Sequence, residues 1–244
     1  MHGTFPPRPG PSEDQADGPA ATPPAMSPDP AATGTDAPDT GPRDTSGLYD
    51  RAYFQGDHTK SNYSDYVADS LGPSRILGDT LHAIFKPATA LDVGCAVGHT
   101  INRLRELGVE ASGYDISHWA VERAARPYIR QFDFSTTPIE GTHDLVYSYD
   151  VVEHVVPDRL EYALKNLWNA TARHLVIVPA LYPEGTTHDP NELTHLIFHD
   201  YDWWAHLMRR CFAADLDEGL TQALAESNHS LTFNYATRIF VFSK

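Results

Sequence analysis

The chain of 244 residues has few cysteines, no long apolar run and little positive charge. Its two cysteines, Cys95 and Cys211, cannot build a disulfide framework, so a reducing cytoplasm fits best. No apolar run approaches the roughly 20 residues that a helix needs to cross a membrane. The N-terminal sequence MHGTFPPRPG also lacks the apolar core of a signal peptide. We therefore expect a soluble, cytoplasmic protein without a membrane partner.

Positive charge is outnumbered, because 18 Lys and Arg oppose 33 Asp and Glu and leave a net charge of −15. Broad contact with nucleic acid or anionic lipid needs clustered Lys and Arg, so this balance disfavours both partners. A small basic groove is still compatible with it. The composition leaves the oligomeric state open.

Apolar periodicity is absent from residues 1–46, which contain eleven of the nineteen prolines. Such a segment cannot bury enough surface to offset the entropy that ordering costs. We predict a disordered tail over residues 1–46 and one globular domain over residues 47–244. The tail is interpreted as a dispensable extension, or as a stretch upstream of a true start at Met26 or later. Recruitment of a partner is the functional alternative.

Strand-like and helix-like segments alternate from Gly47 onward. Runs of Val, Ile and Leu predict strands, and apolar residues at helical spacing predict helices. The predicted strands are 89–94, 109–117, 129–134, 143–152 and 174–180, and the predicted helices are 74–86, 99–108, 117–127, 157–172 and 201–212. Residues 212–220 and 237–244 are expected to add a closing pair of strands. This alternation predicts an α/β fold with a doubly wound, mostly parallel sheet.

The turn after the first strand, LDVGCAVGHT at residues 91–100, contains Gly94 and Gly98. A dinucleotide fingerprint would require glycine also where Ala96 and His99 stand, and the G-K-[ST] of a P-loop is absent. In doubly wound sheets, ligands bind outside the carboxyl ends of the strands. The turn therefore suits a nucleoside ligand that has no pyrophosphate.

Carboxylates end the next two predicted strands. Asp115, in SGYDIS, lies about twenty residues past the glycines and could accept hydrogen bonds from both ribose hydroxyls. Asp133, in RQFDF, could accept from an adenine amino group, with Phe132 or Phe134 against the ring. Either aspartate alone could be a helix cap or a solvated turn residue. Together, at successive strand ends, they predict a nucleoside site.

These segments resemble a known family. LDVGCAVG, SGYDIS, RQFDF and HDLVYSYDVVEHV are similar to four successive signature motifs of class I S-adenosylmethionine-dependent methyltransferases. The resemblance covers roughly residues 48–244, and it implies a Rossmann-like sheet of seven strands whose last strand is antiparallel. It implies that S-adenosylmethionine is bound by Asp92, Gly94, Cys95, Gly98, Asp115, Ile116, Asp133, Phe134 and Tyr149.

The family pattern also implies a role for each part of this cofactor site. Asp92 and the Gly94–Gly98 turn would approach the methionine, Asp115 the ribose, Asp133 the adenine and Tyr149 the sulfonium. Ala96 departs from the pattern, since many members carry glycine there. Alanine is a small change, so we expect binding to survive it.

A second polar cluster follows the fourth predicted strand. A helical turn over SYDVVEHVV would place Asp150, Glu153 and His154 on one face. The segment THDPNELTHLIFHDYDWW follows the fifth strand and adds His195, together with His188, Asp189 and His199. Glu153 and His154 could simply satisfy local hydrogen bonds. Alternatively, His154 or His195 could be a general base, because neutral imidazole accepts a hydroxyl proton near pH 7.

A metal site is the third interpretation of this cluster. The D-x-x-E-H…H arrangement of Asp150, Glu153, His154 and His195 is similar to the metal-binding E-x-x-E-H…H pattern of small-RNA 2′-O-methyltransferases. It is also partly similar to that of ubiquinone-pathway O-methyltransferases. Asp150 is one carbon shorter than glutamate, which weakens the case for direct ligation by Asp150, although a water could bridge it to the ion. The resemblance implies a divalent ion, and the mixed ligands do not decide between Mg²⁺, Mn²⁺ and Fe²⁺.

Aromatic residues flank both clusters. Trp203 and Trp204 could pack in a helix interface, or one of them could wall the acceptor pocket. Four tyrosines near the start of the domain could form a water-excluding lid over the cofactor, or could simply pack; these are Tyr49, Tyr53, Tyr63 and Tyr66.

The combined prediction is a methyltransferase that acts on a hydroxyl, or secondarily an amine, of a small molecule. A natural product or a sugar, and hence secondary metabolism, is the leading expectation for the acceptor. One alternative is a non-catalytic regulatory or scaffold protein that binds the cofactor. The other alternative is a nucleic-acid 2′-O-methyltransferase.

Overall fold

The computed structural model describes residues 45–56, 61, 63–190, 192–227 and 237–244. Residues 1–44 of the predicted disordered tail therefore lie outside the described residues. Pro42–Lys244 form one compact unit. Within the described ranges, no helix combines the length and the apolar content that a membrane span requires.

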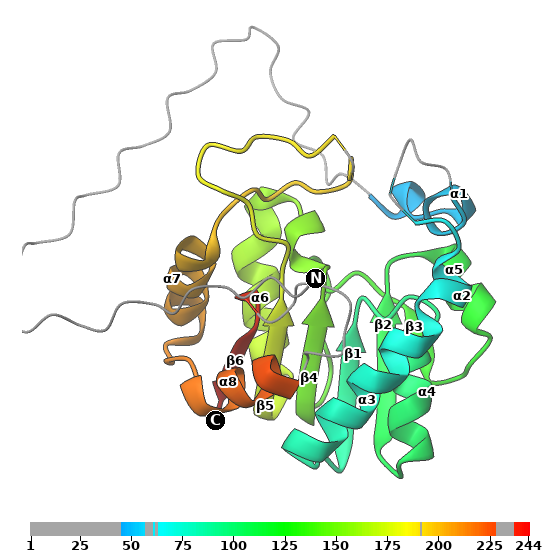
Figure 1. Ribbon diagram of the computed structural model, residues 1–244, viewed down its shortest axis with the longest axis horizontal. Coiled ribbons are helices and arrows are strands. Elements are labelled where there is room, and N and C mark those ends of the chain that lie inside the picture. The colour runs from blue at the N-terminus through cyan, green and yellow to red at the C-terminus, as the bar shows by residue number, and fades with distance from the viewer. Residues whose placement is uncertain (1–44, 57–60, 62, 191, 228–236) are drawn as a thin grey trace, which may run out of the picture. The chain divides into compact units, whose positions relative to one another are not determined.

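A six-stranded sheet in the order β3-β2-β1-β4-β5-β6 organises this unit (Figure 1). Its strands are β1 Thr89–Val93, β2 Glu110–Asp115, β3 Ile129–Gln131, β4 His143–Tyr149, β5 Thr171–Val178 and β6 Phe240–Ser243. Strands β1 to β5 pair in parallel, and β6 runs antiparallel to β5, with His174 opposite Ser243. These features confirm the doubly wound, mostly parallel α/β fold and its antiparallel last strand.

The expected count of seven strands is wrong for the described residues. Residues 212–220 do not form a strand, because they end one helix and begin another, and they contribute a single bridge from Leu216 to Phe242. Leu220 and Leu224 are four residues apart and therefore lie on one face of the second helix. Leu224 is fully buried. The last strand therefore pairs with β5 and has no long partner on its other edge among the described residues.

Helices cover both faces of the sheet. The longer ones are α3 Leu71–Phe85, α4 His99–Glu106, α5 His118–Ala124, α6 Leu160–Asn169, α7 Tyr201–Phe212 and α8 Glu218–Ser227. The short ones are η1 Ser46–Leu48, α1 Arg51–Phe54, α2 Tyr66–Asp69, η2 Val152–His154 and η3 Pro157–Arg159. One apolar core packs α6 and α7 on the sheet, and a second packs α3, α4 and α8 on the opposite face.

Alternating side chains of the central strands feed these two cores. In β5, Leu175 and Ile177 belong to the core under α6 and α7, whereas Val176 and Val178 belong to the core under α3 and α4. All four are fully buried. A strand buried on both faces reads as a continuous apolar run, which is why the sequence pattern located β1, β4 and β5.

Two segments lie beyond the carboxyl ends of the strands (Figure 1). The first contains η1 and α1, and the second is the connection from β5 to α7, residues 179–200. The backbone N–H of Tyr182 donates to the carbonyl oxygen of His199 at 2.9 Å and closes the base of the second segment. Both segments cover the edge of the sheet where ligands bind in this class of fold.

Candidate active site

Two adjoining pockets open at the carboxyl ends of β1, β2 and β4. Tyr66, Gly94, Tyr149 and Asp150 line both of them. The first pocket also includes Tyr49, Ala96, Asp115, Ile116, Phe132, Asp133 and Phe134. The second pocket also includes Asp92, Cys95, Tyr147, Asp189, Glu192, His195 and Arg238. The predicted cofactor residues except Gly98 thus line one or both of these pockets, with Tyr149 at the junction.

The glycine turn between β1 and α4 is built for close approach. Gly94 adopts a φ of +85°, and a Cβ there would lie 2.1 Å from Val151 Cγ2. The N–H groups of Gly94 and Cys95 both donate to the carbonyl oxygen of Tyr114, at 2.8 and 3.0 Å. Gly98 instead faces β3, where a Cβ would lie 2.1 Å from Ile129 Cδ1. Glycine is required at both positions, at Gly94 for the pocket floor and at Gly98 for packing.

Asp115 ends β2 and joins it to the glycine turn. Its Oδ2 accepts from the N–H of Ala96 at 2.7 Å, and its Oδ1 accepts from the N–H of Ser117 at 2.8 Å. Burial raises the pKa of this carboxyl to about 6, while the two N–H donors oppose the rise. Each carboxylate oxygen has a second lone pair, so Asp115 can still accept from a ligand hydroxyl in the first pocket.

Asp133 caps its own turn and also lines the first pocket. Its Oδ1 accepts from the backbone N–H and the hydroxyl of Ser135, at 2.9 and 2.6 Å. Its Oδ2 lies 3.9 Å from Arg159 Nη1. The capping role and a ligand role therefore involve different oxygens, and the structure accommodates both. Phe134, next to it, is buried and lines the same pocket.

Asp92 ends β1 in the second pocket and is almost fully buried. Burial raises the pKa of its carboxyl to about 8, the nearby hydroxyl of Tyr147 opposes the rise, and the charge of Asp115 adds to it. Asp92 therefore carries a proton at pH 7. A positively charged ligand group nearby would favour its ionised form.

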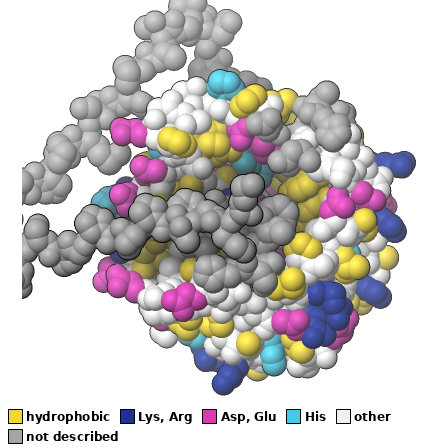
Figure 2. Space-filling model, viewed as in Figure 1, with side chains coloured by type: hydrophobic (Ala, Val, Ile, Leu, Met, Phe, Trp, Pro, Cys, Tyr) yellow, Lys and Arg dark blue, Asp and Glu magenta, His cyan; other side chains and the backbone are white. Residues whose placement is uncertain are grey.

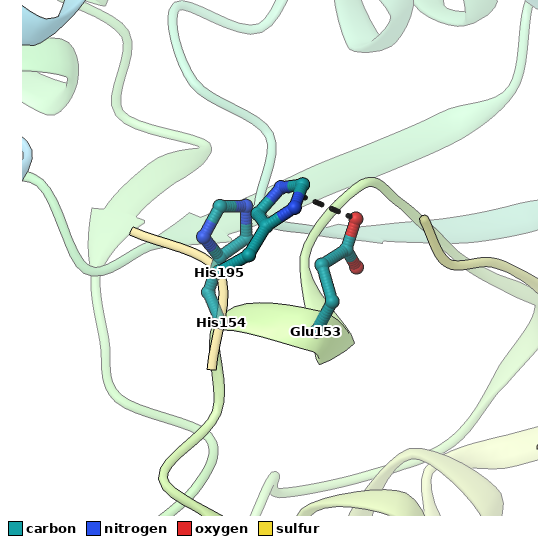
Figure 3. A group of neighbouring side chains, drawn as sticks. All are labelled: Glu153, His154 and His195. Carbon is teal, nitrogen blue, oxygen red and sulfur yellow. Dashed lines mark ion pairs between the residues drawn. The ribbon is translucent and has the colours of Figure 1, made fainter. Parts of the chain in front are cut away.

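Three of the four predicted metal ligands come together above β4 (Figure 3). Glu153 and His154 lie on η2, and His195 comes from the 179–200 segment. Each offers one ligand atom, and these atoms lie within 4.8 Å of one another. His195 Nε2 is 3.9 Å from Glu153 Oε1, and the two imidazole rings have centroids 4.5 Å apart.

Asp150, the fourth predicted ligand, is held by another residue. Its Oδ1 accepts from Arg238 Nη1 at 2.7 Å, and Arg238 also donates to the carbonyl oxygen of Pro179. Asp150 has a φ of +52°, which is uncommon for a residue with a side chain. Sequence reasoning missed Arg238, because nothing in TRIFVFSK marks it and its partner lies 88 positions away.

Glu153 is the most buried group of the cluster, with no solvent exposure. Its Oε1 accepts from the N–H of Ala180 at 2.8 Å, and its Oε2 has no hydrogen-bond partner among the described residues. Burial raises the pKa of this carboxyl to about 8, and the charge of Asp150 adds to the rise. Its carbonyl oxygen accepts from Leu196 and Ile197, which ties the 179–200 segment to η2.

Both histidines of the cluster are neutral at pH 7. Burial lowers the pKa of His154 to about 4, and burial together with the proximity of His154 lowers the pKa of His195 to about 3. His154 Nδ1 lies 3.1 Å from the carbonyl oxygen of Thr194, and His195 Nδ1 contacts the hydroxyl of Tyr182. Sequence reasoning missed Tyr182 and Thr194; their one signal is membership of the polar segment that carries His195.

The aromatic residues divide between packing and pocket lining. Trp204 is fully buried in the α6–α7 core, and Trp203 stacks on His199 with ring centroids 3.7 Å apart. Neither is among the residues that line the two pockets. The predicted lid tyrosines form edge-to-face pairs, and all four line one of the pockets: Tyr49, Tyr53, Tyr63 and Tyr66.

Comparisons with known proteins agree with this geometry. Residues 69–181 match the family model described as a methyltransferase domain. No curated protein matches the chain in sequence. The chain spans about half the length of several solved structures that it matches, among them the mitomycin 7-O-methyltransferase MmcR.

Three solved structures share its fold at low sequence identity. MmcR is 14% identical over 72% of this chain and 53% of its own, with a TM-score of 0.51. The [4+2]-cyclase SpnF is 15% identical over 79% and 85%, with a TM-score of 0.52. Magnesium protoporphyrin IX methyltransferase from Synechocystis PCC 6803, with bound SAH, is 14% identical over 77% and 90%, with a TM-score of 0.50. At these identities the likeness concerns the fold.

Proposed function

We propose that this chain, whose residues 69–181 are a methyltransferase domain, transfers the methyl group of S-adenosylmethionine to a hydroxyl of a small molecule. The observation that carries this proposal is the pair of pockets that meet at Gly94, Tyr149 and Asp150. One pocket has carboxylates and aromatic rings suited to a nucleoside. The other is lined by His195, with Glu153 buried 3.9 Å behind it, and His154 lines the first pocket. An acceptor in the second pocket would therefore face the donor beside this cluster.

The cofactor would lie along the crevice. Asp115 would accept from the ribose hydroxyls and Asp133, through Oδ2, from the adenine amino group. Asp92 and the glycine turn would contact the methionine, whose ammonium would stabilise the ionised form of Asp92. Tyr149, at the junction, would lie beside the sulfonium.

Transfer would be a single displacement. The acceptor oxygen forms a bond to the methyl carbon as the carbon–sulfur bond breaks. The electron pair of the broken bond stays on sulfur, and the acceptor hydroxyl loses its proton. The protein contributes mainly by holding donor and acceptor in line. Exclusion of water by Tyr49, Tyr53 and Tyr66 would assist, because the sulfonium charge disappears in the transition state.

The acceptor-side cluster fits a divalent cation. Two neutral imidazoles and Glu153, whose Oε2 has no hydrogen-bond partner among the described residues, form a mixed nitrogen and oxygen donor set. His154, His195 and Glu153 would hold the ion, and Asp150, paired with Arg238, would lie beside it. When bound, a Mg²⁺, Mn²⁺ or Fe²⁺ ion would lower the pKa of an acceptor hydroxyl.

General-base catalysis by His154 or His195 is the second route for the proton. A base works best when its pKa lies near the operating pH. The pKa values of about 4 and 3 make these imidazoles weak bases at pH 7. The metal-assisted route is therefore preferred over the unaided imidazole.

A hydroxylated natural product or sugar is the acceptor class that we propose, with an amine as the second choice. The net charge of −15 disfavours a nucleic acid. The name of MmcR describes an oxygen methylation on a small molecule, which supports the same class. SpnF, a cyclase with this fold, is the reason to keep a role without methyl transfer as the alternative.

The test is transfer of labelled methyl from S-adenosylmethionine into a small-molecule extract of the source cells, with and without a chelator. We expect label in a small molecule, its loss with chelator, and a fall of about 100-fold or more in His154→Ala and His195→Ala. His206→Ala, an exposed histidine on α7, is the matched control and should keep full transfer.

Three outcomes would contradict parts of this proposal. Label that enters nucleic acid in a strongly salt-dependent way would replace the acceptor class. Chelator-resistant transfer would remove the metal. Cofactor binding without transfer to any fraction would favour the non-catalytic alternative.

A further inference from the structure

The hydroxyl of Tyr182 lies between Asp189 and His195. It donates to Asp189 Oδ2 at 3.0 Å, and it also contacts His195 Nδ1. The three residues belong to the 179–200 segment, which is closed at its base by Tyr182 and His199. Through Tyr182, this network contacts His195, which is one of the three residues of the acceptor-side cluster.

The donor and acceptor capacities of these groups determine where the protons lie. A carboxylate only accepts hydrogen bonds, and a tyrosine hydroxyl has one proton to give. If that proton points to Asp189, the contact with His195 requires Nδ1–H to donate to the tyrosine oxygen. A neutral imidazole has one N–H, so His195 Nε2 then carries a lone pair. That nitrogen is the atom 3.9 Å from Glu153 Oε1.

His154 follows the same pattern through a different partner. Its Nδ1 lies 3.1 Å from the carbonyl oxygen of Thr194, which can only accept. The hydroxyl of Thr194 also lies 3.0 Å from Nδ1, but it donates its own proton to Glu192 Oε1 at 2.5 Å. His154 is therefore also the Nδ1–H tautomer. The 179–200 segment thus supplies the Nδ1 partner of both histidines.

We propose that Tyr182, held by Asp189, is a positioning residue that fixes His195 as the Nδ1–H tautomer and directs its Nε2 toward Glu153 and His154. Hydrogen bonds to the second ring nitrogen commonly set the tautomer and orientation of a histidine that binds metal or moves protons. The role of His195 as a metal ligand or base rests on the proposed function. The assignment of its tautomer does not depend on that function.

The experiment is nitrogen NMR of full-length protein with ¹⁵N-labelled histidines, kept in chelator, with His195 assigned from its loss in His195→Gln. In the wild type, we expect the His195 Nε2 resonance in the unprotonated range. Tyr182→Phe removes the acceptor of Nδ1–H and should mix the two tautomers. Asp189→Ala leaves the Tyr182 proton available to Nδ1 and should shift His195 toward the Nε2–H form.

Tyr162→Phe is the matched control, because Tyr162 is an exposed tyrosine on α6, and it should leave the His195 signals unchanged. In the labelled-methyl assay, Tyr182→Phe should lower transfer about 10- to 100-fold without changing the affinity for S-adenosylhomocysteine. Circular dichroism is used to check that each variant is folded. If Tyr182→Phe does not fold, Asp189→Ala provides the test.

The proposal is overturned if wild-type His195 is protonated at Nε2, or if the folded variants keep the wild-type tautomer. A tautomer change in the variants supports it even if the wild type transfers no methyl group. That combination would reject the proposed function and leave the positioning role in place.

Discussion

At the scale of single residues, burial keeps three titratable groups of this site uncharged at pH 7. Asp92 and Glu153 have pKa values raised to about 8, and His154 has a pKa lowered to about 4. Such groups are neutral at pH 7 in the absence of a ligand. A positively charged ligand part would favour ionised carboxylates, so the site is suited to a sulfonium, an ammonium or a metal ion.

Asp92 gives a prediction about stability and pH. Between pH 5.5 and pH 7 its carboxyl is protonated in the folded chain, where its pKa is about 8, and ionised in the unfolded chain, whose reference pKa is 3.8. The folded state then binds one more proton, so the free energy of unfolding falls by about 1.4 kcal/mol per pH unit for this group. Asp92→Asn should remove that share of the slope when urea unfolding is measured at pH 5.5, 6.25 and 7.

Glu153 contributes to the slope in the wild type and in the variant, so the comparison isolates Asp92. Asp79→Asn is the control, since Asp79 is an exposed partner of Arg103, and it should leave the slope unchanged. Equal slopes in wild type and Asp92→Asn would show that Asp92 is ionised in the folded protein.

The carboxylates at strand ends could be located from sequence, and the ion pair of the cluster could not. Asp115 and Asp133 follow apolar runs directly, and the ends of parallel strands share one edge of the sheet. Asp150 also follows its strand, but its orientation depends on a positive φ and on Arg238 from the opposite end of the domain. Neither condition leaves a local sequence signal.

At the scale of elements, the turn between β1 and α4 shows what its glycines do. Gly98 has a φ of +75°, and a Cβ would lie 2.1 Å from Ile129 Cδ1. Gly108, after α4, has a φ of +89° but nothing within 4 Å of an added Cβ. The two glycines share a left-handed backbone conformation, but only Gly98 lacks space for a Cβ atom.

This difference predicts that Gly98→Ala destabilises the fold more than Gly108→Ala. Both variants pay left-handed strain of about 1–2 kcal/mol. Overpacking should add about 1–3 kcal/mol at Gly98 alone. The free energy of unfolding in urea measures both, and equal losses would mean that Ile129 moves aside without cost.

The segment of η1 and α1 gives the second prediction at this scale. If it covers the cofactor, S-adenosylhomocysteine should slow amide hydrogen exchange in residues 45–56, which include Tyr49 and Tyr53 of the first pocket. Helix α8, Glu218–Ser227, has no residue among those that line the two pockets and serves as the internal control. Protection that is unchanged in residues 45–56 on ligand binding would leave these tyrosines with a packing role only.

Element prediction from sequence succeeded where both faces of a strand are buried and failed at the closing segment. β1, β4 and β5 each contain adjacent buried apolar residues, such as Leu175 to Val178 in β5. Residues 212–220 carry too few apolar residues to distinguish a strand from the end of α7 and the start of α8. The helical conformation of α8 is favoured by burial of Leu224, which packs in the core under α3 and α4.

At the scale of the whole molecule, the charge distribution favours a small acceptor. On the face shown in Figure 2, the densest group of Lys and Arg lies over α3 and α4, below the carboxyl ends of the strands. Arg75 and Arg103 there pair with Glu106 and Asp79. These cations are neutralised by neighbours, so they provide no basic surface beside the proposed site.

Titration calorimetry with S-adenosylhomocysteine shows most directly whether the crevice at the strand ends is the proposed S-adenosylmethionine site. We expect one site per chain in the wild type, at least about tenfold weaker binding in Asp115→Asn because hydrogen bonds to its carboxylate are lost, and unchanged binding in Asp79→Asn. No binding by the wild type, or equal affinity in Asp115→Asn, would rule out this crevice as the cofactor site.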